Sequence, residues 1–309
     1  MTNLNKNSKK AFSLVEISIV ILIIGLLIAG ISKASDLIFD ANQSSARSIT
    51  KASKVNRMPS LVLWLETTLV ESIKDSERYN DATVTTWRDI NPQSTTKFIF
   101  RNSGGTPKYV EPGKNLPAIG SLSDANFFTP GTETSSTALN YPVNDIFNSA
   151  SATIIMVLKS KNVTADLFTF CPSAGCSAGK TISLGLAAGK PKFIFPNDTA
   201  DVAATTTLDY NNKAPDVIIV SAEKDSAGVK IAVNGASAAS ATNTSTLLSS
   251  AFSTTATGLF KIGGGATAAT GVEIYEIIVF SSALNDGDRQ SVEAYLAKKY
   301  NTTVVKAAL

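Results

Sequence analysis

The sequence predicts a long N-terminal α-helix, membrane-spanning at its start, followed by an all-β antiparallel sandwich and a short C-terminal helix. Three observations predict this fold class. An apolar run lies near the N-terminus, a segment without Gly or Pro follows it from Ser32 to Met58, and short β-rich runs fill most of the remaining chain. A chain of 309 residues can bury a full hydrophobic core, and a composition of 44% hydrophobic and 17% charged residues excludes a disordered or collagen-like protein.

The composition also excludes several kinds of chemistry. Histidine is absent, so the chain has no Ser-His-Asp or Cys-His catalytic pair and no His-ligated zinc site. The net charge of +3 comes from Lys6, Lys9 and Lys10; without them the 28 basic side chains fall to 25 and equal the 25 acidic ones. A neutral body without a long basic run argues against nucleic acid as a partner.

A membrane segment is predicted directly after these lysines. Between Lys10 and Lys33 lie 22 residues with one charge, that of Glu16. A bilayer is crossed by roughly 20 apolar residues, so we expect residues 17–32 to span it, with the lysines in the cytoplasm and the rest outside. The alternative is a cleaved secretory signal peptide. Its small-residue cleavage site should follow the apolar run, whereas Ala11 precedes it.

The segment Lys9-Lys10-Ala11-Phe12-Ser13-Leu14-Val15-Glu16, running into the apolar helix, resembles the class III signal of type IV pilins and type II secretion pseudopilins. The resemblance implies that a prepilin peptidase cuts between Ala11 and Phe12. Residues 1–11 would then be a cleaved leader, and Phe12 would become the N-methylated first residue. The resemblance covers about a tenth of the chain.

Glu16 matches the buried acid of that family. An ionised carboxylate inside hydrocarbon is costly and needs a partner. We expect the partner to be the ammonium group of Phe12 on a neighbouring subunit of a filament. The alternative is an acid at the membrane edge that reaches toward the headgroups. The sequence departs from the family pattern at Ala11, where glycine usually precedes the cut, and at Lys33, near where many pilins have a proline.

The helix is expected to continue beyond the membrane, giving a pilin-type N-terminal helix over residues 12–58. Apolar residues recur at spacings compatible with one helical face, at Ile38, Ala41, Ile49, Ala52 and Val55. Pro59 is expected to end the helix, so a second domain should occupy residues 60–309.

This second domain is predicted to be all-β. Its strand-like runs are Leu61–Leu65, Lys97–Phe100, Ala152–Leu158, Lys192–Phe195, Asp216–Val220, Val229–Val233 and Val272–Phe280. Asn234-Gly235 and Ala188-Gly189 are hairpin turn signals. Many short strands without helices between them predict an antiparallel sandwich or barrel.

The order of these segments resembles the laminin-G-like or concanavalin A-like jelly rolls of bacterial exported proteins. The matching segments are Leu63–Leu65, Thr86–Asn91, Thr153–Leu158, Val233–Gly235, Lys261–Gly264, Glu273–Phe280 and Ala283–Tyr300. The last segment predicts a helix capped near Asn285 or Asp286. The resemblance implies a lectin-like domain that binds carbohydrate, sometimes through calcium, or that serves only as a structural module.

We expect no catalytic residue, metal or cofactor in this domain. Some enzymes of this shape use a strand Glu-x-Asp-x-Glu to cleave glycans. Here Glu273 and Glu276 are three residues apart, which places them on opposite faces of a regular strand. A glycan hydrolase is therefore disfavoured.

Other polar and aromatic residues have structural explanations. Asp286 and Asp288 suggest either calcium or acids that complement a helix dipole, and we favour the dipole. Trp64 and Trp87 could stack on a sugar, but both lie in strand-like sequence and are expected in the core.

Cys171 and Cys176 are separated by four residues that include Pro and Gly. In an exported domain they can close a small loop as a disulfide, which we favour over two reduced structural thiols. A metal site would need more ligands than two thiolates.

These features predict a non-enzymatic subunit, a minor pilin or pseudopilin, of a type IV pilus-like or type II secretion filament, with a major subunit as the other option. It would assemble through its helix and display the sandwich for adhesion. The expected partners are prepilin peptidase, other pilin subunits, the inner-membrane assembly machinery, and carbohydrate or a host or cell surface. The protein would be a single-pass inner-membrane protein with a periplasmic C-terminal domain, and later part of a pilus or the cell surface. The alternative is a membrane-tethered carbohydrate-binding protein that does not polymerise.

Overall fold

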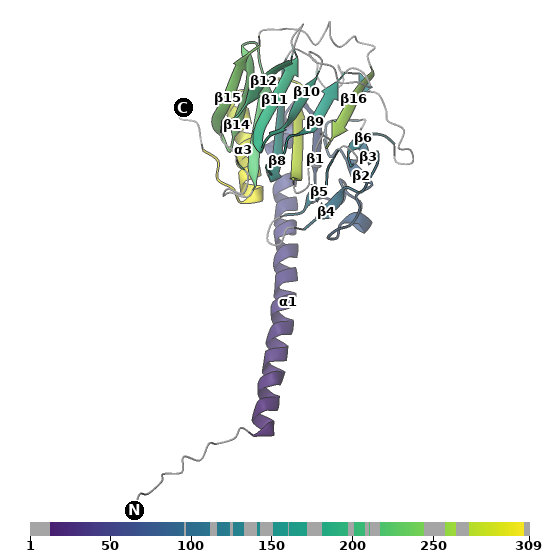
Figure 1. The fold of residues 1–309 in the computed structure, drawn as a ribbon, viewed down its shortest axis with the longest axis vertical. Helices are drawn as coiled ribbons and strands as arrows, with labels where there is room; N and C mark the ends of the chain where they lie inside the picture. The colour runs from purple at the N-terminus through teal and green to yellow at the C-terminus, as the bar shows by residue number, and fades with distance from the viewer. Residues whose placement is uncertain are drawn as a thin grey trace, which may run out of the picture. The chain divides into compact units, whose positions relative to one another are not determined.

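The computed structural model describes residues 13–95, 97–111, 116–123, 126–132, 141–142, 151–159, 161–171, 181–196, 201–207, 210, 217–243, 257–263 and 272–305. The chain forms two compact units, Met1–Ser44 and Ser45–Leu309. The first contains most of one helix, and the second contains two β-sheets and a C-terminal helix (Figure 1). The predicted fold class, a long N-terminal helix followed by an antiparallel sandwich and a short C-terminal helix, is confirmed.

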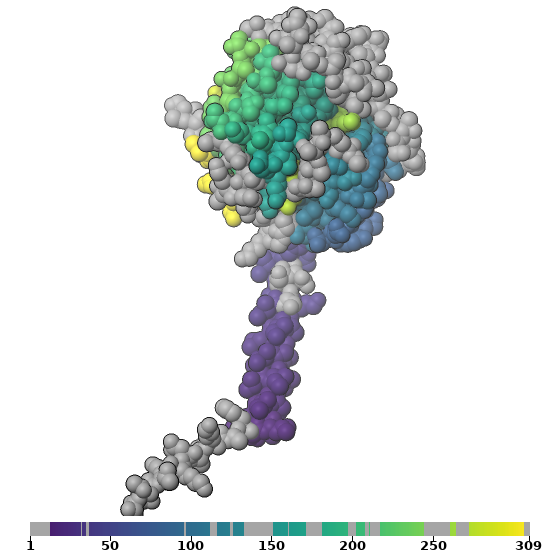
Figure 2. All heavy atoms as spheres, in the orientation of Figure 1, coloured from purple at the N-terminus to yellow at the C-terminus, as the bar shows by residue number. Residues whose placement is uncertain are grey.

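Helix α1 (Leu14–Lys51) begins in the apolar segment. Two hydrogen bonds close its first turn: the Val15 N–H donates to Ser13 Oγ at 3.3 Å, and the Ser13 N–H donates to the Glu16 carboxylate at 2.7 Å. Reciprocal bonds of this kind form a capping box. The segment Leu14–Ile31 has a mean hydropathy of 2.9 and no buried residue, and its uncovered side chains are visible in Figure 2. Its length and composition are sufficient to cross a membrane.

Helix α1 ends at Lys51, earlier than the end expected at Met58. The side-chain amide of Asn56 donates to the backbone oxygens of Lys51 at 2.9 Å and Ser53 at 3.1 Å. In a continuing helix these oxygens would accept bonds from the next turn. Because Asn56 takes that place, the helix stops and the chain enters a 3₁₀ helix, η1 (Lys54–Arg57).

One sheet of the sandwich has the strand order β15-β14-β13-β8-β17-β5-β4, with β1 also paired to β17. All its pairings are antiparallel. Its strands are β1 (Leu61–Glu66), β4 (Lys108–Val110), β5 (Ala118–Gly120), β8 (Ala152–Lys159), β13 (Ile218–Lys224), β14 (Gly228–Val233), β15 (Ala236–Thr242) and β17 (Glu273–Phe280).

The second sheet has the order β12-β11-β10-β9-β16-β6-β3-β2, with β7 also paired to β16. Its strands are β2 (Thr86–Arg88), β3 (Ile99–Asn102), β6 (Phe128–Pro130), β7 (Tyr141–Pro142), β9 (Ala165–Cys171), β10 (Ile182–Ala187), β11 (Lys190–Pro196), β12 (Asp201–Thr205) and β16 (Thr257–Ile262). A short 3₁₀ helix, η2 (Asp75–Glu77), precedes β2.

Strand β8 is covered on both faces. Ile154, Met156 and Leu158 belong to the apolar core between the sheets. Ile155 and Val157 belong to a second apolar cluster, which the first sheet forms with η1 and helix α3 (Asp286–Tyr300). Burial on both faces explains why this strand is a continuous apolar run instead of an alternating one.

Both predicted hairpin turns are confirmed. Asn234 and Gly235, between β14 and β15, have φ angles of 49° and 80°. Ala188 and Gly189, between β10 and β11, have φ angles of 50° and 77°. Two successive positive φ angles are typical of the type I′ turn, which matches the twist of paired strands. At Gly235 a side chain is excluded as well, because a Cβ atom would lie 2.3 Å from the backbone oxygen of Val305.

Candidate functional site

The predicted assembly residues lie at the N-terminus. Glu16 is exposed in the first turn of α1, and its carboxylate accepts the N–H of Ser13 from its own chain at 2.7 Å. Ala11 and Phe12 lie outside the described residues, so the cleavage site and the pairing of Phe12 with Glu16 stay predictions.

The sandwich contains a buried ionic cluster that the sequence analysis did not predict. Lys299 Nζ, on α3, lies 2.8 Å from the Glu276 carboxylate of β17 and 3.0 Å from the Glu66 carboxylate of β1, and all three side chains are fully buried. Burial alone would lower the pKa of Lys299, but the two carboxylates hold it above its usual value. Burial would likewise raise the pKa of Glu66, but Lys299 and hydrogen bonds from Thr68 hold it below its usual value. Lys299 and Glu66 therefore form a charged pair, with a protonated ammonium group and an ionised carboxylate.

Hydrogen bonds saturate the carboxylate of Glu276. Trp64 Nε1 and the Tyr295 hydroxyl each donate to one of its oxygens at 2.7 Å, and the Tyr300 hydroxyl donates to the other at 2.8 Å. Burial, followed by the charge of Glu276, raises the pKa of both tyrosines well above the usual value, so they remain neutral donors. Thr50, in the last turn of α1, lies 3.3 Å from the Tyr295 hydroxyl. The three charged side chains are closed to solvent, and the cluster joins α1, β1, β17 and α3.

The expectation that Glu273 and Glu276 lie on opposite faces of their strand is wrong. A β-bulge interrupts β17 between Ile274 and Glu276. A bulge adds one residue and shifts the alternation of side chains. Tyr275 therefore faces the same side as both acids. Its hydroxyl donates to Glu273 at 2.8 Å, and its ring belongs to the second apolar cluster, on the side of the sheet where Glu276 lies. Glu276 is nevertheless held by Lys299 and is inaccessible to a substrate.

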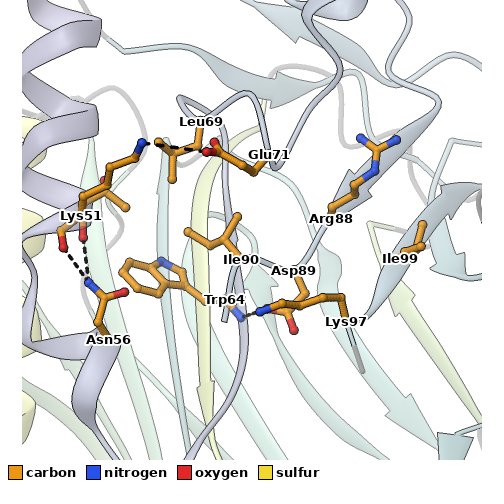
Figure 3. Close-up of a pocket in the computed structure, with 11 residues that line it drawn as sticks. Lys51, Asn56, Trp64, Leu69, Glu71, Arg88, Asp89, Ile90, Lys97 and Ile99 are labelled. Atoms are coloured by element: carbon orange, nitrogen blue, oxygen red, sulfur yellow. Dashed lines mark hydrogen bonds and ion pairs between the residues drawn. The ribbon is translucent and has the colours of Figure 1, made fainter. Parts of the chain in front are cut away.

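A cavity of about 510 Å³ lies beside the end of α1 (Figure 3). Its charged lining residues are Lys51, Glu71, Arg88, Asp89 and Lys97, and its apolar ones include Leu69, Ile90 and Ile99. Trp64 also lines it, and its indole nitrogen reaches the ionic cluster. The volume falls within the range of roughly 300–1,000 Å³ that is typical of small-molecule sites.

Among the charged residues that line this cavity, Asp89 is the most deeply buried. Only 4% of the residue is exposed. Its Oδ1 accepts the backbone N–H groups of Trp64 at 2.9 Å and Asn91 at 2.8 Å. Its Oδ2 is buried and has no hydrogen-bond partner among the described residues. Burial raises the pKa of Asp89 to about 6, although the N–H donors and the charge of Lys97 oppose this shift.

The basic residues of the cavity differ in their surroundings. Lys51 pairs with Glu71 at 3.9 Å, and both side chains are mostly exposed. Arg88 is the last residue of the short strand β2, and its backbone N–H donates to the backbone oxygen of Ser72 at 2.8 Å. Lys97 is exposed. The sequence does not predict this cavity, because Thr86–Asn91 matches a fold signature; the adjacent Arg88 and Asp89 in it are the available signal.

The remaining predicted residues have mixed outcomes. Trp64 and Trp87 are fully buried, so their assignment to the core is confirmed. Asn285 caps α3, because its side-chain oxygen accepts the Asp288 N–H at 2.9 Å. Of the two cysteines, Cys171 ends β9 and Cys176 lies outside the described residues, so the disulfide stays a prediction.

Comparison with known proteins gives one family match. Residues 6–32 match the model of the prokaryotic N-terminal methylation motif. No curated protein sequence matches the chain significantly.

Among solved structures, the chain is similar to the binding domain of botulinum neurotoxin serotype D/C, with 16% identity, a TM-score of 0.48, and coverage of 79% of this chain and 53% of that one. It is also similar to the serotype C1 binding domain, with 14% identity, a TM-score of 0.47 and coverage of 80% and 53%. A third similar structure is the receptor binding domain of the C/D mosaic serotype, with 14% identity, a TM-score of 0.49 and coverage of 77% and 51%. The chain thus spans about half the length of these structures. These similarities concern the fold alone.

Proposed function

We propose that the chain is a non-enzymatic pilin-type subunit, a minor pilin or pseudopilin, that polymerises through α1 and displays its sandwich for adhesion. The observation that carries this proposal is the methylation motif over residues 6–32, which includes Glu16 at the start of an exposed apolar helix. Prepilin peptidase would remove residues 1–11 and methylate Phe12. The sandwich would face the periplasm and later the outside of the cell.

Assembly would depend on the charge of Glu16. Once the helix is in a bilayer or a filament core, an ionised carboxylate without a partner is strongly disfavoured. The ammonium group of Phe12 on a neighbouring subunit would supply the opposite charge. The energy gained on pairing would set the axial position of each incoming subunit.

A non-enzymatic sandwich is supported by the state of its acids. Glu276 is enclosed by Lys299 and three hydrogen-bond donors, and Glu66 is fully buried beside it. Neither carboxylate is available to act as the acid or nucleophile of a glycan hydrolase, which needs both groups at the scissile bond.

A membrane-tethered binding protein that does not polymerise is the second candidate, and one observation favours it. The N–H of Ser13 already gives Glu16 a hydrogen-bond donor within its own chain. This bond is compatible with an acid that caps its own helix and needs no neighbour.

Variants of Glu16 distinguish the polymerising subunit from the tethered protein. The assay is the fraction of subunit recovered in sheared filaments at equal membrane abundance, with intact mass reporting cleavage before Phe12. If pairing drives assembly, Glu16→Ala and Glu16→Val should be inserted and cleaved but should fail to enter filaments, whereas Glu16→Asp should assemble partially. Asp40→Ala, at an exposed acid of α1 beyond the apolar segment, is the matched control and should assemble normally. Normal incorporation of both Glu16→Ala and Glu16→Val would favour the tethered protein.

A further inference from the structure

We propose that the cavity beside Asp89 binds a hydroxylated carboxylate, namely an acidic sugar unit of a polysaccharide. The inference deepens the proposed function and rests on its display of the sandwich for adhesion. The cavity is built by residues of the sandwich unit, from Thr50 to Ile99.

The first requirement on the ligand comes from Asp89. Its Oδ1 is saturated by two backbone N–H groups, and its Oδ2 is buried without a hydrogen-bond partner among the described residues. A buried acceptor left unpaired costs roughly 1–3 kcal/mol, and more when it is charged. A ligand that donates a hydrogen bond to Oδ2 removes this cost. The ligand must therefore carry a hydroxyl or N–H group.

The second requirement comes from the charged residues that line the cavity. Lys51, Arg88 and Lys97 outnumber Glu71 and Asp89 among the charged lining residues, so the cavity has one excess positive charge. Figure 3 shows the Lys97 side chain beside Asp89, whereas the guanidinium group of Arg88 points away from Asp89. Arg and Lys groups bind carboxylates through strong charge-assisted hydrogen bonds. A ligand with one negative charge would neutralise the site.

Together the two requirements exclude simpler ligands. A phosphate ion offers negative charge, but it has few hydrogen-bond donors for Asp89. An amine would donate to Asp89, but three cations repel it. An acidic sugar supplies both hydroxyl donors and a carboxylate. The apolar side chains of Leu69, Ile90 and Ile99 offer a surface for the C–H groups of its ring.

Trp64 does not serve as a stacking platform in this site. Trp64 is fully buried, and its indole N–H donates to the Glu276 carboxylate. Its role is to position Asp89, because its backbone N–H donates to Oδ1 at 2.9 Å. Recognition is thus expected to depend on hydrogen bonds and charge, with a marked salt dependence.

The test uses the full processed chain in detergent and titrates it with trigalacturonate, with neutral galactotriose as the comparison ligand, by calorimetry. We expect trigalacturonate to bind at least tenfold more tightly than galactotriose. Asp89→Asn, which keeps the Oδ1 acceptor, should weaken binding at least tenfold. Lys97→Gln, at an exposed position, should weaken it about threefold to tenfold and reduce its salt dependence. Lys298→Gln, at an exposed lysine of α3, is the matched control and should bind as the unmodified chain does.

The proposal would be overturned by no binding of trigalacturonate, by equal binding of galactotriose, or by an equal loss of affinity in Lys97→Gln and Lys298→Gln. Unchanged affinity in Asp89→Asn would also overturn it. The sheared-filament fraction of the same variants separates this inference from the proposed function. A chain that assembles without binding the sugar retains the assembly function and loses only this site, whereas a chain that binds without assembling retains only the site.

Discussion

The ionic cluster and the cavity both bury carboxylates, but they satisfy them differently. In the cluster, Glu276 receives an ammonium group and three hydrogen-bond donors. In the cavity, Asp89 has two donors on one oxygen and none among the described residues on the other. The saturated carboxylate fastens elements together, whereas burial raises the pKa of the half-satisfied one to about 6 and leaves one of its oxygens without a donor among the described residues.

The largest effect is expected from breaking the saturated site. Lys299→Met removes the ammonium group and leaves Glu66 and Glu276 buried without a cation. Loss of one partner of a buried ion pair costs roughly 3–5 kcal/mol, so the free energy of unfolding should fall by about that amount. Chemical denaturation of the full chain in detergent measures it. The neighbouring exposed Lys298→Met is the control, and equal stability of the two variants would contradict the role given to the cluster.

An intermediate effect, dependent on pH, is expected at the half-satisfied site. The pKa of Asp89 is raised from 3.8 to about 6, so in this window the folded chain holds a proton that the unfolded chain has lost. The stability contributed by this group therefore falls as the pH rises from about 4 to about 6, by at most about 3 kcal/mol. The Asp89→Asn variant has no titrating group at this position, so its stability should not show this decrease.

The measurement is the difference in the free energy of unfolding between the Asp89→Asn variant and the unmodified chain at pH 4.5 and pH 7.5. Compared with the unmodified chain, the variant should be relatively more stable at the higher pH than at the lower one. A difference that does not change between the two pH values would show that Asp89 titrates normally.

The smallest effect is expected from removing one donor from the saturated site. Tyr300→Phe deletes the hydroxyl that donates to Glu276 at 2.8 Å, while Lys299 remains beside the same oxygen. A hydrogen bond to a charged group contributes roughly 1.5–3 kcal/mol, and the remaining ammonium should keep the loss near the lower value. The midpoint temperature of thermal unfolding of this variant should lie between that of the unmodified chain and that of Lys299→Met. A loss as large as that of Lys299→Met would contradict this order.

The sequence predicted the parts of the fold that depend on local patterns. Apolar runs identified strands such as β8, β13 and β17, and positive-φ turn residues identified the hairpin at Asn234-Gly235. Strand β15 was missed because it consists of Ala, Ser and Thr and has no apolar alternation. Its structure depends on the preceding turn and on pairing with β14, which single-residue preferences do not encode.

The sites were harder to predict because they assemble residues distant in sequence. Glu66 and Lys299 are 233 positions apart, and they meet only when α3 packs on the first sheet. The bulge in β17 reversed the expected facing of Glu273 and Glu276, since one added residue shifts the alternation. The end of α1 at Lys51 depends on the side chain of Asn56, which acts against the local helical pattern.

The position of Thr50 has a mechanical consequence. Two of the routes by which a tension carried along α1 would leave the helix are the backbone, through η1 into β1, and the Thr50 and Tyr295 hydroxyls, which lead to Glu276. Both routes end on β17, because β1 pairs with it and Glu276 belongs to it. Strand β17 is itself held by β8 and β5. The part of a load that these two routes carry would thus enter the sandwich at one of its most extensively bonded strands, where local opening is most costly.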